Sequence, residues 1–134
     1  MTQEDYISYE TAKLLKEKGF TLPVKNYYSL YTEDVKHNLQ RKYGAKKNWN
    51  SFAFAVSRPS QSLVMKWLRE VHHLHISIEM GFDVDNHQYY FFVPSICKFS
   101  SKTGEYQTPF DEREFDSYKE ACEAAIKYCL ENLI

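Results

Sequence analysis

The feature that most constrains the fold is a change in the spacing of apolar residues at position 74. A period of two begins there, and it places one set of apolar side chains on a single face of an extended strand. These residues are Leu74, Ile76, Ile78 and Met80. A turn at residues 83–87 separates this strand from residues 88–96, whose run of consecutive aromatic residues favours a second strand. The two segments together predict a β-hairpin.

The second strand carries Pro94, which has no backbone N–H to donate to a sheet. We therefore expect this strand to end near Pro94 or to lie at the edge of the sheet.

Helical patterns flank the hairpin on both sides. Residues 59–72 begin with Pro59, which suits the first turn of a helix, and continue with apolar residues at helical spacing. These residues are Leu63, Val64, Trp67, Leu68 and Val71. After a polar loop at residues 100–114, Ser117 and Glu120 form a capping-box pattern ahead of a C-terminal amphipathic helix.

The first half of the chain carries four further predicted elements. Ser8 and Gly19 are the expected N-cap and C-terminal stop of a helix over residues 10–18. Weaker patterns predict a tyrosine-rich strand at residues 24–31, a short helix at 32–44 and a strand at 51–56. The expected order is α-β-α-β-α-β-β-α, an α+β fold in which an antiparallel sheet with a central β-hairpin packs against amphipathic helices.

The length of 134 residues predicts a single α+β domain over residues 1–134. No flexible linker, internal repeat, secretory signal or membrane-spanning apolar run is found in the sequence. Cys97, Cys122 and Cys129 lack the close spacing of a zinc or redox motif, so we expect reduced thiols, with Cys122 and Cys129 on the buried face of the last helix. These features together predict a cytoplasmic protein without a membrane partner.

Titratable residues gather around the predicted hairpin: His72, His73, His75, Glu79, Asp83, Asp85 and His87. On a strand, His73, His75 and Glu79 would share one polar face, which suits a zinc-like ion. A solvated sheet face explains the same pattern without a ligand. Motifs for nucleophilic catalysis and phosphate binding are absent from the sequence. We therefore predict no metal site, no cofactor, no catalytic residue and no enzyme activity.

A long stretch of the sequence is basic. Residues 35–69 contain eight basic residues and no acidic one, whereas residues 105–131 carry eight acidic against three basic residues. The basic residues are Lys36, Arg41, Lys42, Lys46, Lys47, Arg58, Lys66 and Arg69. Because Tyr43 and Trp49 lie among them, this segment is a candidate for nucleic-acid contacts that combine phosphate binding with stacking. A solvated face, or one that faces the acidic C-terminal region, is the simpler explanation.

The order of elements also allows a winged-helix arrangement, with residues 59–72 as recognition helix and the turn at 83–87 as wing. The long gap between Gly44 and Pro59, which contains a predicted strand, does not suit a helix-turn-helix connection.

Three stretches carry a resemblance to a known group of proteins: YISYETAKLLKEKGF at residues 6–20, PSQSLVMKWLREVHHLHISI at 59–78 and FDSYKEACEAAIKYCLENLI at 115–134. They resemble a family of short uncharacterised proteins from gut anaerobic bacteria and their prophages, which have a PTQSLAMKWLREVH-like helix and an EACEAAIKYCLENL-like C-terminal helix. Ser60 stands where the family has threonine, and residues 24–49 are expanded. The resemblance implies a small bacterial or prophage-encoded accessory protein and brings no activity or cofactor with it.

The leading expectation is a non-catalytic accessory protein that acts by protein binding through its aromatic hairpin and the neighbouring surface, because catalytic motifs are absent and the abundant tyrosine is favoured at interfaces. The alternative is a nucleic-acid-binding domain that uses the basic segment at residues 35–69.

Overall fold

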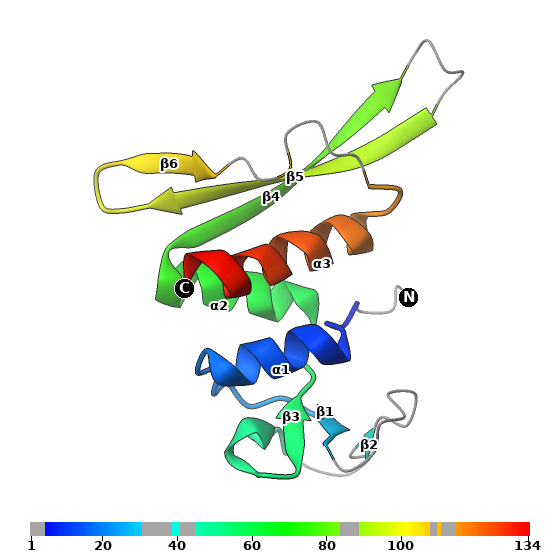
Figure 1. The fold of residues 1–134 in the computed structure, drawn as a ribbon, viewed down its shortest axis with the longest axis vertical. Coiled ribbons are helices and arrows are strands. Elements are labelled where there is room, and N and C mark those ends of the chain that lie inside the picture. The colour runs from blue at the N-terminus through cyan, green and yellow to red at the C-terminus, as the bar shows by residue number, and fades with distance from the viewer. Residues whose placement is uncertain (1–4, 31–38, 41–44, 84–88, 108–109, 111–114) are drawn as a thin grey trace. The chain divides into compact units, whose positions relative to one another are not determined.

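The computed structural model has an α+β fold, which confirms the predicted class (Figure 1). It describes residues 5–30, 39–40, 45–83, 89–107, 110 and 115–134. The chain divides into two compact units, residues 1–61 and 62–134. The expected single domain stays a prediction. No helix in the described part of the chain is long and apolar enough to cross a membrane.

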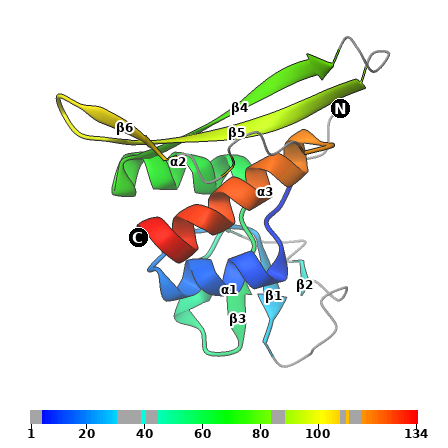
Figure 2. The same ribbon diagram turned by 45° about the horizontal axis from the view of Figure 1, so that its top comes forward.

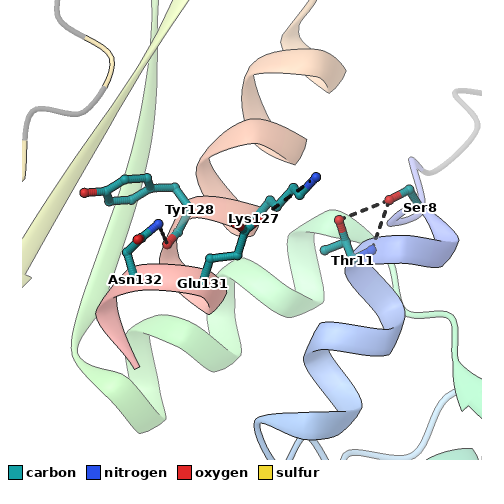
Figure 3. A network of polar contacts seen from close by, with 6 residues as sticks. All are labelled: Ser8, Thr11, Lys127, Tyr128, Glu131 and Asn132. Atoms are coloured by element: carbon teal, nitrogen blue, oxygen red, sulfur yellow. Dashed lines mark hydrogen bonds and ion pairs between the residues drawn. The ribbon is translucent and has the colours of Figure 1, made fainter.

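Helix α1 (Tyr9–Glu17) of the first unit has the predicted caps. The Ser8 side chain accepts a hydrogen bond from the Thr11 backbone N–H at 3.2 Å and donates one to the Thr11 hydroxyl at 3.0 Å (Figure 3). At the other end Gly19 has a φ of +86°, the left-handed conformation in which glycine closes helices. Both boundary residues are therefore confirmed.

A three-stranded antiparallel sheet completes the first unit, in the order β2 (Leu39–Gln40), β1 (Asn26–Ser29) and β3 (Ala55–Ser57). The buried Tyr28 of β1 donates a hydrogen bond from its hydroxyl to the Ile7 carbonyl at 2.7 Å. Lys16 of α1 donates to the Phe52 and Ala55 carbonyls, both at 2.9 Å. These bonds join the helix and its N-terminal approach to the sheet.

Two predictions for this unit are wrong in part. The short helix expected at residues 32–44 lies largely outside the described residues, but its middle residues Leu39 and Gln40 are strand β2. Of the strand expected at 51–56 only residues 55 and 56 are extended, in β3, because residues 49–51 form a 3-10 turn, η1 (Trp49–Ser51), and residues 52–54 continue as a bend and a turn. Trp49 explains the difference: its indole N–H donates to the Val24 carbonyl at 2.9 Å, and this buried bond holds the segment in a turn.

The second unit contains the predicted hairpin. Helix α2 (Gln61–His72), whose first residue belongs to the first unit, leads through His73 into β4 (Leu74–Asp83). Strand β5 (Tyr89–Phe99) pairs antiparallel with every residue of β4, and β6 (Gly104–Gln107) pairs with the C-terminal end of β5. The sheet order is β4-β5-β6. Both strands of the hairpin are longer than the sequence pattern indicated.

Pro94 neither ends β5 nor lies on an edge strand, which corrects the prediction. It pairs with Ile78 inside the ladder. The Phe92 N–H and carbonyl bond to Phe115, at 2.8 and 2.9 Å, on the side of β5 that faces away from β4. Alternation places the nitrogen of Pro94 on that same side, between the Phe115 bridge and the start of β6 pairing at Ile96. Pro94 therefore lacks its N–H at a position between Phe115 and β6, where this side of β5 has no pairing partner among the described residues.

Helix α3 (Tyr118–Tyr128) contacts β4 and β5 and lies along one side of the hairpin in both ribbon views (Figures 1 and 2). Ser117 accepts a hydrogen bond from the Glu120 N–H at 3.1 Å, as the capping pattern predicted. The helix continues into a π-helical turn, η2 (Cys129–Leu133). Its buried residues are Ala121, Cys122, Ala125, Ile126, Cys129 and Leu130. On its exposed side Asn132 donates to the Tyr128 carbonyl at 3.3 Å (Figure 3).

The burial of these thiols generates a prediction. Cys122 and Cys129 are fully buried and burial raises the pKa of Cys129 to about 12, whereas Cys97 is partly exposed. Because the thiolate is the reactive form, we expect a disulfide reagent at pH 8 to modify Cys97 alone in the folded protein and all three thiols in denaturant. Spectrophotometric thiol counting measures this. Cys97→Ser serves as the control with no fast thiol, and rapid native modification of Cys129 would contradict the packing of α3.

Candidate protein-binding surface

One face of the hairpin is apolar along most of its length. The antiparallel register puts the even-numbered residues of β4 and β5 on this face, in the pairs Leu74–Lys98, Ile76–Ile96, Ile78–Pro94, Met80–Phe92 and Phe82–Tyr90. Lys98 is the one charged member of the set. The sequence pattern predicted this face as far as Met80. The structure extends it through Phe82, which continues the period of two but lies beyond the predicted end of the strand.

The two halves of the apolar face differ in exposure. Next to α2 and β6, Leu74, Ile76 and Ile96 are buried. Toward the turn, Met80 is 65% exposed, Phe82 52% and Tyr90 53%. The buried apolar face therefore continues toward the turn with residues that are also apolar. In that half of the hairpin the other described residues leave these side chains largely exposed.

Helix α3 marks the boundary between the two halves. Its first residue, Tyr118, packs its ring perpendicular to that of Phe92 with centroids 6.1 Å apart, and Phe92 packs in the same way against Tyr90 at 6.0 Å. Tyr118 is itself 50% exposed. Partial burial, and the neighbouring Cys122 thiol, raise the pKa of the Tyr118 hydroxyl, which therefore stays neutral. We call Met80, Phe82, Tyr90 and Tyr118 the distal apolar surface.

The opposite face of the hairpin is polar near α2 and aromatic near the turn. His75, Ser77 and Glu79 lie opposite Cys97, Ser95 and Val93. Farther along, the Phe91 ring covers Gly81 so closely that a Cβ atom added there would lie 2.3 Å from ring carbons. The neighbouring Tyr89 donates from its hydroxyl to the Asp116 carboxylate at 2.8 Å. These contacts fix the turn-side half of β5.

The hairpin histidines that the structure describes are not gathered into one site. His73 has a φ of +57°, so it ends α2 instead of continuing the polar face of β4, and its ring packs against Phe99 at 5.4 Å. His72 packs against Trp67 at 4.7 Å. Asp85 and His87 lie outside the described residues. Among the residues that the structure does describe, no three His, Cys, Asp or Glu side chains are placed to hold a metal ion.

The basic residues of segment 35–69 have different surroundings. Lys36, Arg41, Lys42 and the neighbouring Tyr43 lie outside the described residues. Lys46 and Lys47 are exposed in the first unit, and Lys66 and Arg69 are exposed on α2. Arg58 is half-buried, with its guanidinium 4.3 Å from the Tyr6 ring centre and its Nε donating to the Tyr28 hydroxyl at 3.2 Å. Arg58 therefore acts as a packing residue.

Trp49 does not provide a stacking platform, contrary to the expectation. It is only 3% exposed, and Tyr27 covers its ring at a centroid distance of 4.3 Å. Lys47 places its ammonium group 5.7 Å from the indole centre, a cation–π contact. The exposed aromatic of this cluster is Phe52, at 37%.

Comparisons of the chain with protein-family models, with curated proteins and with solved structures find no match.

His72 gives a prediction on pH dependence. Burial, and then the charge of His73, lower the pKa of His72 below its usual 6.5, and its Nε2 atom is buried without a hydrogen-bond partner among the described residues. As pH falls below 6.5, the unfolded chain takes up a proton that the folded His72 resists, so the free energy of unfolding falls. Urea unfolding at pH 7.5 and pH 5 measures this loss. We expect a smaller loss in His72→Gln than in His75→Gln, which alters an exposed histidine; equal losses would contradict the assignment.

Proposed function

We propose that this chain is a small non-catalytic accessory protein that binds another protein through its distal apolar surface. The observation that carries the proposal is the exposure of Met80, Phe82 and Tyr90 on a face whose other half is core. Contiguous exposed apolar surface of this kind is typical of interaction sites, and tyrosine and methionine are enriched there. The resemblance to short bacterial and prophage proteins supports a bacterial or prophage origin, and three cysteines that form no disulfide support a cytoplasmic location.

The chemistry of the surface indicates how a partner is held. Full burial of a large apolar side chain contributes roughly 1.5–3 kcal/mol. Met80, Phe82 and Tyr90 are each half to two-thirds exposed, so each contributes only part of that amount when a partner covers it. The Tyr90 hydroxyl remains able to donate a hydrogen bond at the rim. The proposal assigns no catalytic residue, metal or cofactor to the chain.

Site-specific photo-cross-linking in the native host tests this surface. With p-benzoylphenylalanine at position 82, we expect one dominant adduct with another polypeptide. Replacing Met80→Glu and Tyr90→Glu together should weaken the interaction roughly tenfold to a hundredfold, because two large side chains at the centre of an interface become charged. Both residues are exposed, so the melting temperature should change little.

The matched control places the same photo-reactive residue at position 71. Val71 is 56% exposed on α2 and lies outside the distal apolar surface. Equal yields of adduct from positions 71 and 82, or an adduct from position 82 that survives the double replacement, would contradict the proposal. Turnover of a small molecule by the purified chain, lost on mutation of His75, would contradict its non-catalytic part.

A second candidate function is nucleic-acid binding through the first unit. The observation that favours it is the exposed pair Lys46 and Lys47 next to an aromatic cluster: the Lys47 ammonium lies 5.7 Å from the Trp49 ring centre, and the partly exposed Phe52 ring lies 5.7 Å from that ring. Before α2, however, stands strand β3 in place of the first helix of a helix-turn-helix, so the winged-helix version receives no support.

Titration of duplex and single-stranded DNA at low salt tests this second function. If it holds, affinity should fall steeply as salt rises, and Lys46→Glu with Lys47→Glu should abolish binding. Lys66→Glu with Arg69→Glu on α2 provides a control of equal charge change. Absence of salt-dependent binding by the unmodified protein would exclude the function.

A further inference from the structure

The outer edge of β4 differs between its two halves. β4 pairs with β5 on one side, and no strand among the described residues pairs with its other side. Leu74 and Ile76 are buried, so the half of this edge next to α2 is closed. Every residue of 78–83 is at least partly exposed, and Met80 and Phe82 are 65% and 52% exposed. A further strand can therefore pair only with residues 78–83, which we call the distal edge.

The backbone groups that face the distal edge belong to residues of the distal apolar surface. Phe92 uses its N–H and carbonyl to bond Phe115, on the side of β5 away from β4. Met80, its partner across the hairpin, therefore directs its own N–H and carbonyl away from β5. Alternation places the N–H and carbonyl of Phe82 on the same outer side. A strand that bonds to Met80 and Phe82 thus also brings its side chains beside theirs.

The charges around the distal apolar surface are mostly acidic. Residues 77–83, 89–95 and 115–123, which form or border it, contain five acidic residues and one basic residue. A second copy of the chain would bring the same excess of negative charge to the contact, whereas a basic segment would be attracted to it. These charges favour a different, basic protein as the occupant. The acidic residues are Glu79, Asp83, Asp116, Glu120 and Glu123, and the basic residue is Lys119.

The side chains of the distal edge suit a strand that alternates apolar and basic residues. The edge contains neither lysine nor proline, which protect many natural edge strands from strand addition. On one face, Met80 and Phe82 offer apolar contacts to every second residue of a bound strand. On the other face Glu79 is exposed, and a lysine or arginine opposite it forms an ion pair across the two strands.

We propose that the distal edge of β4 binds an extended segment of another protein in which apolar and basic residues alternate. The segment pairs antiparallel, which is the more stable arrangement. Its apolar side chains pack beside Met80 and Phe82, its basic side chains face Glu79, and the β4-β5-β6 sheet gains a fourth strand. This inference rests on the proposed function, because it specifies the conformation and chemistry of the partner at that same surface.

Synthetic peptides test the inference with the whole chain. The probe is a fluorescein-labelled hexapeptide of alternating valine and lysine, and fluorescence anisotropy measures its binding. We expect saturable binding that weakens as salt rises, and none for the peptide with glutamate in place of lysine. N-methylation of the valines removes the N–H groups that face β4 and should abolish binding, whereas N-methylation of the lysines should not. Equal binding of the two N-methylated peptides would overturn the inference.

Substitutions in β4 give an independent measurement. Met80→Pro removes a donor from the distal edge without breaking a bond to β5, whereas Met80→Ala keeps that donor. The proline variant should therefore bind the peptide roughly tenfold more weakly than the alanine variant. Glu79→Lys should weaken binding about fivefold. Glu105→Lys, at an exposed glutamate of β6, is the control of equal charge change and should have no effect. Equal affinities within either pair of variants would overturn the inference.

Two further outcomes separate this inference from the proposed function. Absence of peptide binding, while position 82 still cross-links to another polypeptide in cells, would overturn the inference and leave the proposed function standing. Sedimentation velocity reports the other outcome: self-association of the purified chain that Met80→Pro abolishes would place a second copy at the distal edge and overturn the inference as well.

Discussion

The packing of α3 against the first half of the hairpin is the contact on which the second unit depends. Leu74, Ile76 and Ile96 provide an apolar surface, and the alanines and Cys122 of α3 are small enough to lie close to it. Small residues at the helix surface allow the backbone of the helix to approach the sheet. This contact ends at Tyr118. Residues of β4 and β5 that lie beyond Tyr118, toward the turn, are therefore exposed instead of buried.

Local sequence patterns predicted the elements that such contacts stabilise. The caps of α1 at Ser8 and Gly19, the cap of α3 at Ser117 and the alternation beginning at Leu74 each follow from chemistry within a few residues. Elements that depend on distant partners were predicted less well. Residues 49–51 turn because Trp49 bonds to Val24, and β5 continues through Pro94 because the donor it lacks falls between two partners far away in sequence.

The candidate surface could be located from sequence only in part. Alternation placed Met80 on the apolar face, but its exposure depends on where α3 begins relative to the hairpin, which no pattern in β4 records. In the basic segment, the sequence showed the charges but not their surroundings. Arg58 packs against two tyrosine rings and Trp49 is buried, so both residues contribute to the packing of the first unit.

The position of the Phe91 ring over Gly81 has a consequence for how such sequences diverge. The ring occupies the volume that a side chain at position 81 would need, so the face of β4 is completed there by a residue of β5. A larger residue at 81 displaces the ring, and a smaller one at 91 uncovers bare backbone. We therefore expect these two positions to vary as a pair, with glycine retained wherever the aromatic ring is retained.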